Sequence, residues 1–467
     1  MTLAHVQTRP ASLPAAFTNE LRALLGERFS EALAVREQHG GGGMHLANLP
    51  PQAVASPQTV NEVVAIVRAC ARERIPLIPY GAGTSLECHV GARHGGVSID
   101  MSGMQRIVRV DVEDQDCIVE AGVTRESLNA YLRDTGLFFP VDPGANATLA
   151  GMAATRASGT TTLRYGGMRE NVLGLTIVTA DARLIRTARR ARKSSAGYDL
   201  TRLLIGSEGT LGVIVDLTLR LSATPEAVST ARCAFPSTEA AVRTVIDLVQ
   251  LGVPLARAEL LDDVQMTAIN RLFGLDYAEA DTLFLEFHGR ADEVAAQARR
   301  AAAVAREHEG GAFQWATETE ERNRMWRARH QAGPAAVALR PGARPWSTDV
   351  CVPVSRLAEC IRETKRDLAN APFPAVVLGH VGDGNFHVIM LTQPDAPEEL
   401  RAAENINRRL VARAIDMDGT CTGEHGVGLG KQEAVRAELG AAVDLMADIK
   451  RAMDPHHILN PGKIFAI

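Results

Sequence analysis

The spacing of hydrophobic positions predicts a region of mixed helices and strands in the first half of this chain. Thr59 and Glu62 match a helix capping box, and Val60, Val63 and Val67 follow at helical spacing. Short apolar runs typical of strands come next, at 75–80, 97–101, 107–110, 117–123, 172–179 and 211–221.

The pattern changes near Thr224 and Pro225. Alanine-rich helical segments then alternate with strand-like runs, the helices at 239–251 and 293–307 and the strands at 282–287, 349–354 and 376–380. Such alternation predicts a second α+β domain built on an antiparallel sheet flanked by helices. A final helix is expected at 434–453. We therefore predict domains at 1–222 and 223–430, with a C-terminal helical segment at 431–467.

Two histidines flank a predicted turn in the second domain. Aliphatic runs at 375–378 and 388–391 enclose Asp383-Gly384, the preferred centre of a two-residue type I′ turn. If the turn is centred there, His380 lies directly opposite His387, with Cβ atoms roughly 5 Å apart on one face of the sheet. Two imidazoles at that separation can converge on one metal ion.

A nearby motif, Gly423-Glu424-His425-Gly426, offers the rest of a metal centre. Glu424 would be an anionic third ligand beside His380 and His387, which leaves a coordination position open as in catalytic zinc sites. Two imidazoles and a carboxylate suit zinc and manganese alike. His425 lies next to this ligand and is available as an acid or a base. The alternative is a hairpin with two surface histidines and an unrelated Glu-His pair.

The composition narrows the class of protein. Hydrophobic residues make up 46% of the chain and charged residues 22%, which is typical of a soluble globular protein. The net charge of −5 gives no electrostatic reason to expect nucleic acid or an anionic membrane as a partner. Seven cysteines without a C-x-x-C spacing favour reduced thiols. Since we also see no secretory signal in residues 1–14, we expect a cytoplasmic protein and leave peripheral association at the inner membrane open.

A glycine loop follows the apolar run at 75–80. Gly81-x-Gly83 suggests a dinucleotide fingerprint, but Leu86 stands where the third glycine is needed, and no helical periodicity follows. A Rossmann NAD site is therefore not expected. The loop can still hold an anion with successive backbone N–H groups, or it can be an ordinary tight turn.

The order of several motifs resembles known families. The first half resembles the FAD-binding domain of the vanillyl-alcohol-oxidase-like, PCMH-type flavoproteins at 79–87, 140–144, 151–154, 157–159, 197–200 and 206–212. The second half resembles the branch of D-lactate dehydrogenases (cytochrome) and glycolate oxidases at 340–342, 348–353, 379–387, 420–426 and 460–463. The resemblance runs from about residue 50 to the C-terminus.

This resemblance implies a fold and a cofactor. The first domain would be a two-subdomain FAD-binding domain, the second would cap the flavin and carry the metal and substrate groups, and the C-terminal segment would return to the FAD domain. A non-covalent FAD would be bound by residues of both the first domain and the tail: Pro79, Gly81, Ala82, Gly83, Thr84, Ser85, Pro140, Asp142, Pro143, Gly151, Ala154, Ser158, Gly159, Glu208, Gly209, Gly212, Ile214 and Asn460.

The resemblance also implies a reaction, the oxidation of a small 2-hydroxy acid. A zinc or manganese ion on His380, His387 and Glu424 would polarise the substrate hydroxyl, and His425 would take its proton. Arg340 would bind the substrate carboxylate, and Asn385 the substrate or a metal-bound water. We expect an FAD- and metal-dependent D-2-hydroxyacid dehydrogenase that oxidises D-lactate to pyruvate. Its electrons would pass to a cytochrome, a quinone or an electron-transfer flavoprotein.

Other functions are also compatible with the sequence. Within the class, these are the flavin subunit of a glycolate oxidase or a D-2-hydroxyglutarate dehydrogenase. Outside it, they are a zinc hydrolase and a non-catalytic binding protein. A homodimer is also left open.

Three positions depart from the pattern of the relatives. Cys88 stands where relatives usually have glycine, and Asp181-Ala182 replaces a usual Asp-Gly turn. Ser347 stands where relatives that oxidise 2-hydroxyglutarate carry a lysine. Without that cation a second substrate carboxylate lacks an obvious counter-charge.

Overall fold

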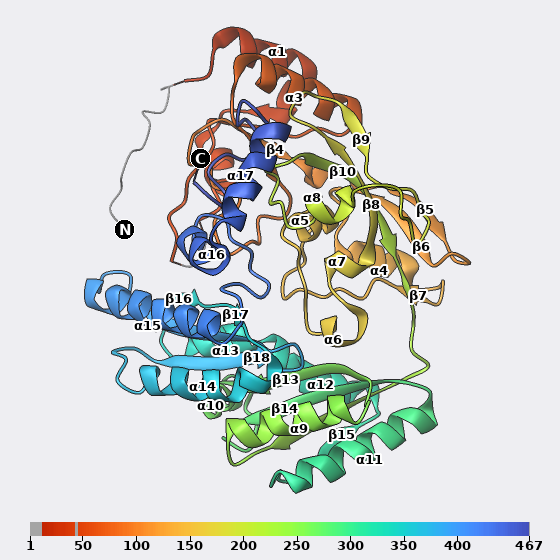
Figure 1. The fold of residues 1–467 in the computed structure, drawn as a ribbon, viewed down its shortest axis with the longest axis vertical. Helices are drawn as coiled ribbons and strands as arrows, with labels where there is room; N and C mark the ends of the chain where they lie inside the picture. The colour runs from red at the N-terminus through yellow and green to blue at the C-terminus, as the bar shows by residue number, and fades with distance from the viewer. Residues whose placement is uncertain (1–11, 43–44, 467) are drawn as a thin grey trace. The chain divides into compact units, whose positions relative to one another are not determined.

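The chain folds into two compact units, and the computed structural model describes residues 12–42 and 45–466 (Figure 1). The first unit comprises Met1–Ser158, Gly167–Ala223 and Glu424–Ile467, and the second comprises Gly159–Gly166 and Thr224–Gly423. The predicted domain division stays a prediction. The compact units differ from it in three places, because 159–166 belongs to the second unit, and Ala223 and 424–430 belong to the first. The expectation of no secretory signal concerned residues 1–14. Of these, residues 1–11 lie outside the described residues.

The first unit contains two sheets. The smaller has the order β1 (Phe29–Ser30), β2 (Ala53–Ala55), β4 (Val97–Asp100) and β3 (Leu77–Tyr80), and the larger has the order β5 (Ile107–Asp111), β6 (Asp116–Glu120), β10 (Val213–Arg220), β8 (Val172–Val178) and β9 (Leu184–Arg186). A short pair joins β7 (Leu137–Phe138) to β11 (Ser222–Ala223). The helices are α1 (Ala15–Leu25), α2 (Leu33–Gln38), α3 (Val60–Glu73), α4 (Arg125–Leu132), α5 (Leu149–Ala154), α7 (Met168–Asn171), α8 (Leu200–Leu204), α16 (Gln432–Leu439) and α17 (Ala442–Met453).

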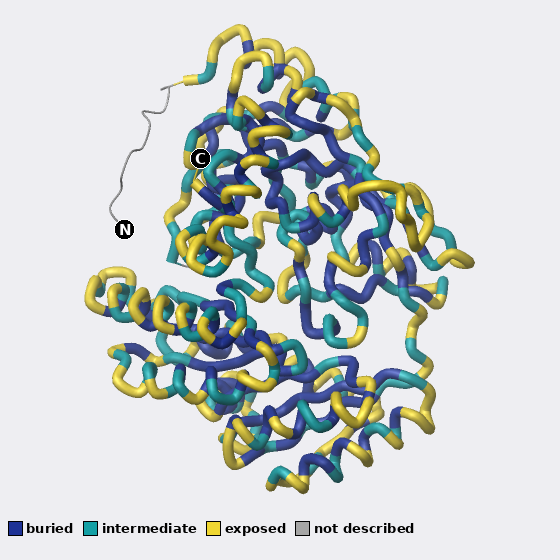
Figure 2. The backbone as a smooth tube through the Cα atoms, in the orientation of Figure 1, coloured by how far each residue is buried: buried dark blue, intermediate teal, exposed yellow. Residues whose placement is uncertain are grey.

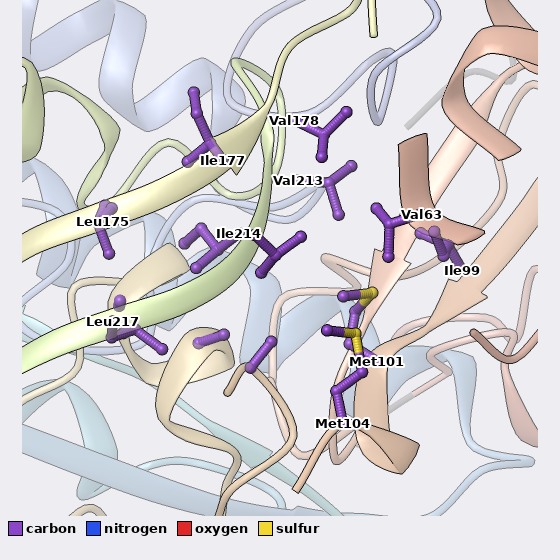
Figure 3. Packing of buried hydrophobic residues seen from close by; sticks show 14 of the residues in the cluster. Val63, Ile99, Met101, Met104, Leu175, Ile177, Val178, Val213, Ile214 and Leu217 are labelled. Atoms are coloured by element: carbon purple, nitrogen blue, oxygen red, sulfur yellow. The ribbon is translucent and has the colours of Figure 1, made fainter. Parts of the chain in front are cut away.

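One hydrophobic cluster joins both sheets of this unit. Ile99 of the smaller sheet and Ile177 and Val213 of the larger belong to it, together with Val63 of α3 (Figure 3). Helix α3 begins where the sequence predicts, since the Thr59 side chain accepts a hydrogen bond from the backbone N–H of Glu62. The C-terminal tail joins the smaller sheet as well: the backbone N–H of Leu77 donates to Ile458, 2.7 Å, and that of Asn460 donates back to Leu77, 2.8 Å.

The second unit is built on an eight-stranded sheet in which all paired strands are antiparallel. The strand order is β15 (Gln314–Ala316), β12 (Ala227–Ala234), β14 (Thr282–Gly289), β13 (Leu255–Leu261), β18 (Ala375–His380), β19 (Asn385–Thr392) and β16 (Arg344–Ser347), and β17 (Val350–Cys351) also pairs with β19. The sheet strands are largely buried, whereas the helices of this unit expose their outer sides (Figure 2).

Side chains of alternate residues on these strands enter different environments. On β14, Leu283, Leu285 and Phe287 belong to one hydrophobic cluster with α9 (Thr238–Gln250), α11 (Ala291–Glu307), α14 (Val354–Leu368) and α15 (Pro397–Asp416). Phe284, on the opposite face of the same strand, belongs to a second cluster with α10 (Asp263–Phe273), α12 (Thr319–His330) and α13 (Ala332–Ala338). The α+β class and the antiparallel sheet flanked by helices, both predicted from the sequence, are confirmed.

A segment from the first half of the sequence packs on the second unit. Residues 159–166 contain α6 (Thr162–Tyr165). Gly382 has room for the Leu163 side chain only because it lacks a Cβ, which would lie 2.5 Å from a Leu163 methyl group. The Tyr165 hydroxyl is 2.7 Å from Nδ1 of His288, whose Nε2 is 2.8 Å from the Glu286 carboxylate. The segment is thus an integral part of the second unit.

The predicted hairpin register is wrong by two residues. His380 is paired with Asn385 and His387 with Leu378, so four residues, 381–384, connect the strands. A type I′ turn needs positive φ at both central residues, and here Gly384 has φ +81° while Asp383 is not among the residues with positive φ. The longer turn packs against β17: the N–H of Val352 donates to the Gly384 carbonyl, and Asn385 pairs with Cys351.

Smaller differences from the predicted elements also have local causes. The helix expected at 434–453 is interrupted at Gly440, which has φ +51°, and becomes α16 and α17.

All seven cysteines are free, as expected for reduced thiols. Within residues 12–42 and 45–466, none of the helices combines the length and the apolar character that a membrane span requires.

Candidate functional site

His380 and His387 converge on one face of the second unit's sheet. They are diagonal neighbours across β18 and β19, and side chains two residues apart on a strand point to the same face. Their ring centroids are 5.6 Å apart, and one ring nitrogen of each lies within 4.8 Å of the other. The convergence expected from the sequence is therefore present, although the register that predicted it is wrong.

Both rings are oriented by acceptors on the protein. Nδ1 of His380 lies 2.7 Å from the Glu259 carboxylate, and Nδ1 of His387 lies 3.0 Å from the carbonyl of Thr348. Because both acceptors are oxygens without protons, each Nδ1 must donate, and in the neutral ring the lone pair is then on Nε2. A histidine held in this way is typical of a metal ligand. The residues present therefore fit a metal centre.

Glu259 connects the pair to a buried arginine. Its side chain is fully buried on β13, and its second oxygen accepts two hydrogen bonds from Arg329 of α12, at 2.9 and 2.5 Å. Burial opposes ionisation of Glu259, but His380 and Arg329 outweigh it and hold the pKa of this carboxyl below its ordinary value. The site thus contains a fixed negative charge behind His380 and a fixed positive charge beside it.

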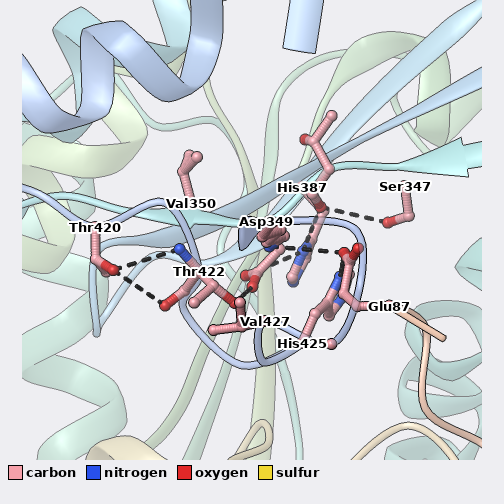
Figure 4. A network of polar contacts seen from close by, with 12 residues as sticks. Glu87, Ser347, Asp349, Val350, His387, Thr420, Thr422, His425 and Val427 are labelled. Atoms are coloured by element: carbon pink, nitrogen blue, oxygen red, sulfur yellow. Dashed lines mark hydrogen bonds and ion pairs between the residues drawn. The ribbon is translucent and has the colours of Figure 1, made fainter. Parts of the chain in front are cut away.

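A second network surrounds His387 (Figure 4). Asp349 is buried, and its two oxygens accept hydrogen bonds from the Asn385 amide and the Thr422 hydroxyl, both at 2.8 Å. It also lies 3.8 Å from Nδ1 of His387. The Asn385 amide nitrogen donates further to the Val350 carbonyl at 2.7 Å. The buried Oδ1 of Asn385 has no hydrogen-bond partner among the residues that the structure describes, so this atom can still accept a hydrogen bond from a ligand.

The stretch before Glu424 is fixed to the same sheet. Thr420 and Cys351 exchange backbone hydrogen bonds at 3.2 and 2.7 Å, and Thr422 donates to Asp349. Glu424 follows Thr422 by two residues. In the first unit its carboxylate accepts a hydrogen bond from the Ser158 hydroxyl at 3.2 Å.

His425 lies in a loop of the first unit. Its Nδ1 is 3.9 Å from the Glu87 carboxylate, and its side chain is 9% exposed. The next residues are held by another buried carboxylate, Glu208, which accepts hydrogen bonds from the N–H groups of Val427 and Gly428 at 2.7 and 2.9 Å. The flavin role expected for Glu208 stays a prediction, and its carboxylate also anchors this loop.

Several residues expected to bind FAD lie next to one another in the first unit. Gly81 lies against the Thr148 hydroxyl, since a Cβ there would be 2.2 Å away from it, and Gly209 packs on Pro79 in the same manner. The Asn460 amide donates to the carbonyls of His89 and Glu208, at 3.0 and 2.7 Å. Most of the others lie in loops or in α5, and Ile214 is part of the hydrophobic core. Gly159 belongs to the segment that packs on the second unit.

Two departures from the relatives coincide with strained backbone. Cys88 has φ +56° and Ala182 has φ +61°, in the left-handed region where glycine is at ease. The left-handed conformation explains why relatives usually have glycine at these two positions. This chain adopts the same conformation with a cysteine and an alanine.

Arg340 is engaged with the protein itself. Its guanidinium donates to both oxygens of Glu399, at 2.8 and 2.9 Å, and to the carbonyl of Leu391 at 2.8 Å. These contacts attach the start of α15 to β19. They favour a structural role, and the substrate role predicted for Arg340 remains untested.

Comparison with protein families decides the identity of the fold and cofactor. A model of an FAD-binding domain matches residues 51–188, and the C-terminal domain of FAD-linked oxidases matches residues 224–464. The chain belongs to the FAD-linked oxidases. This FAD-linked oxidase therefore carries the FAD-binding domain predicted from the sequence, while the non-covalent attachment of FAD stays a prediction.

Curated relatives cover nearly the whole chain. A protein of Danio rerio, described as a probable mitochondrial D-lactate dehydrogenase, is 49% identical over 96% of this chain and 91% of its own length. The mitochondrial D-lactate dehydrogenase (cytochrome) of Arabidopsis thaliana is 43% identical over 99% of this chain and 82% of its own length. A glycolate oxidase subunit of Bacillus subtilis is 32% identical, with 89% of both chains covered.

The same comparison corrects the expected location. The relatives from Danio rerio, Arabidopsis thaliana, Kluyveromyces lactis and Saccharomyces cerevisiae are all described as mitochondrial. These names contradict the cytoplasmic location expected from the sequence.

Solved structures support the fold alone. p-Cresol methylhydroxylase with substrate bound has a TM-score of 0.82 at 18% identity, with 98% of this chain and 99% of that chain covered. 4-Ethylphenol oxidase from Gulosibacter chungangensis has a TM-score of 0.81 at 17% identity, with the same coverage.

Sequence reasoning missed three site residues: Glu259, Arg329 and Asp349. Glu259 is 121 positions away from His380, and no local pattern links them. A signal did exist, because Arg257 and Glu259 alternate with apolar residues in a short strand-like run. Charges on one face of an otherwise apolar strand indicate a polar site on that face.

Proposed function

We propose that this FAD-linked oxidase is a D-2-hydroxyacid dehydrogenase that oxidises D-lactate to pyruvate and passes electrons to a cytochrome-type acceptor. The observation that carries the proposal is the histidine pair, in which both Nδ1 atoms donate to fixed acceptors. The names of the relatives support the substrate and the acceptor: they include D-lactate dehydrogenases at 38–49% identity, and those named as cytochrome enzymes are 38–43% identical.

His380, His387 and Glu424 would hold a divalent metal, zinc or manganese. Support comes from the buried setting of the two histidines, from their oriented rings and from the short tether of Glu424 to Thr422. A metal held there would supply Lewis acidity toward the hydroxyl of the substrate. Asn385 would orient the substrate through its buried Oδ1.

His425 is the proposed general base. Removing two electrons and two protons from a 2-hydroxy acid requires one group that accepts the hydroxyl proton and one that accepts a hydride. FAD, when bound, supplies the hydride acceptor. An imidazole is suited to accepting the hydroxyl proton near neutral pH. Since the adjacent Glu424 would bind the metal, the two neighbouring side chains would have separate tasks.

The substrate carboxylate needs a positive partner, and two arginines compete for this role. Arg340 is the partner expected from the sequence, and it is bound to Glu399, as Arg329 is to Glu259. Arg329 shares Glu259 with His380, which supports it as the cation nearer to the metal ligands. Arg329→Lys should raise KM for D-lactate more than Arg340→Lys does, and the reverse order would favour Arg340.

Anaerobic bleaching of the flavin tests the substrate. We expect D-lactate to reduce the bound flavin faster than L-lactate, glycolate or D-2-hydroxyglutarate. Protein that carries no flavin would contradict the whole proposal, and fastest reduction by glycolate would favour the glycolate oxidase alternative. Fastest reduction by D-2-hydroxyglutarate would contradict the argument from Ser347.

Ser347 allows a gain-of-function version of this test. It pairs with Ile389, two residues beyond His387 on β19, so it lies on the face of the sheet that carries the histidine pair (Figure 4). Ser347→Lys should raise the rate with D-2-hydroxyglutarate relative to D-lactate, because the new cation can pair with a second carboxylate. Ser347→Met, which adds length without charge, is the control.

A further inference from the structure

A buried carboxylate of the FAD-binding domain lies beside the proposed base. Oε1 of Glu87 is 3.9 Å from Nδ1 of His425 (Figure 4). The same oxygen is 3.8 Å from Nζ of Lys431. The three side chains are 5%, 9% and 11% exposed, so water screens their charges little. Glu87 lies two residues beyond Ser85, the last residue of the glycine loop expected at the flavin.

The backbone brings Glu87 and the His425 loop together. The N–H of Leu429 donates to the Glu87 carbonyl at 2.8 Å. A Cβ at Gly428 would lie 2.0 Å from that carbonyl oxygen, and a Cβ at Gly430 would lie 2.1 Å from the Glu87 carboxylate. Only glycine at these two positions allows the loop to approach Glu87 so closely.

A second carboxylate fixes the loop on its other side. Both oxygens of Glu208 accept hydrogen bonds from backbone N–H groups of the loop. Nε2 of His89 lies 3.2 Å from Oε1 of Glu208. Burial works against ionisation of Glu208, but His89 and the two N–H groups overcome it and keep its pKa below the ordinary value. Both oxygens of Glu208 thus serve the backbone, whereas the Glu87 carboxylate lies 3.9 Å from Nδ1 of His425.

We propose that Glu87 is a positioning residue for His425. Its carboxylate accepts Nδ1–H, which fixes the tautomer with the lone pair on Nε2 and aims that nitrogen at the substrate hydroxyl. Lys431 balances the charge of Glu87. The observed 3.9 Å is longer than a hydrogen bond, and such contacts commonly shorten when substrate binds. This inference rests on the proposed role of His425 as the base.

The test compares Glu87→Gln, Glu87→Asp and His425→Ala with the wild-type holoenzyme. Glu433→Gln is the matched control, because it removes one negative charge from an exposed position two residues beyond Lys431. For each variant, the rate of anaerobic flavin reduction at saturating D-lactate, the KM, the FAD content and the Tm are measured.

We expect Glu87→Gln to slow flavin reduction about 10- to 100-fold with KM within about twofold, because the base is misoriented while binding is kept. Glu87→Asp should recover part of the rate, and Glu433→Gln should match the wild type. A Glu87→Gln rate within about twofold of the wild type overturns the inference, as does a change confined to KM. If Glu87→Gln does not retain FAD, Glu87→Asp decides alone: a slower reduction at unchanged KM supports the inference, and a wild-type rate overturns it.

His425→Ala separates this inference from the function on which it rests. If His425→Ala reduces flavin at the wild-type rate, the base is assigned wrongly and the proposed function fails. If only His425→Ala is slow, the proposed function stands and the role of Glu87 is overturned.

Discussion

The histidines of the two units are held in different ways. His380 and His387 stand on neighbouring strands, where the hydrogen-bond ladder fixes their separation and Glu259 and Thr348 fix their rings. His425 stands in an irregular loop whose shape depends on backbone bonds to Glu208 and Glu87. The first arrangement is fixed by its secondary structure, and the second is held at only a few points, by two buried glutamates.

This difference suggests a division of labour. The strands position two of the three proposed metal ligands, His380 and His387, precisely enough for an ion, whose ligands must keep fixed distances; Glu424 comes from the loop. A loop held at a few points can adjust when a substrate arrives, which suits a group that accepts a proton. Changes on the strands should therefore affect metal binding first, and changes in the loop should affect the rate first.

The largest effect is expected from replacing one strand histidine, His387, or the loop histidine, His425. His387→Ala should lose the metal and at least about 1000-fold in kcat, since Lewis acid catalysis contributes several kcal/mol. His425→Ala should keep the metal and lose about 100- to 10,000-fold. Metal content by mass spectrometry and steady-state kinetics distinguish them. His308→Ala, outside the site, is the control, and metal loss in both variants would contradict the division of labour.

The next largest effect is expected at Glu259. Glu259→Gln removes the negative charge that pairs with the buried Arg329, and its single amide oxygen cannot accept from both Arg329 and His380. The free energy of unfolding should therefore fall by about 3 kcal/mol. Metal affinity should fall about 10- to 100-fold. Denaturant unfolding and metal titration measure both, with the exposed Glu279→Gln as the control. Unchanged metal affinity would show that the ring of His380 needs no orienting carboxylate.

Two glycines provide a closer comparison between strand and loop. A Cβ at Gly384 would lie 2.0 Å from the Val352 carbonyl, and a Cβ at Gly428 would lie 2.0 Å from that of Glu87. Each change to alanine should cost about 1–3 kcal/mol of stability, because both glycines also have positive φ. Gly384→Ala should weaken metal binding more, and Gly428→Ala should slow flavin reduction more. The opposite pattern would reverse the assignment of the two regions.

The smallest effect is expected outside both regions, at Ala182. Ala182→Gly relieves the left-handed backbone at φ +61° and should raise the free energy of unfolding by up to about 1 kcal/mol. Metal content and rate should not change. Thermal unfolding measures the gain, and a lower Tm would mean that the flexibility of glycine in the unfolded chain outweighs the relieved strain.

The sequence predicts much of this molecule because its motifs are local. The glycine loop, the Glu-His pair and the hairpin histidines each lie within a few residues, and the family they resemble gives their order a meaning. The hairpin register is not local, since β17 pairs with Asn385 and Phe386 and lengthens the turn. Glu259 and Arg329 come from distant segments, so the supports of His380 could only be found in the folded chain.

Residues 159–166 belong to the second unit although their neighbours in sequence belong to the first, and this has a consequence for how the polypeptide is made. The second unit is encoded by two separate stretches, and the packing of side chains on its sheet is incomplete until Leu163 and Tyr165 have docked. During synthesis this short stretch leaves the ribosome more than a hundred residues before Gly382, the position that it covers. It must therefore wait, exposed, for its binding surface to be translated. A fragment beginning at Thr224 would lack it altogether, so we expect such a fragment to expose apolar surface and aggregate unless a peptide containing α6 is supplied.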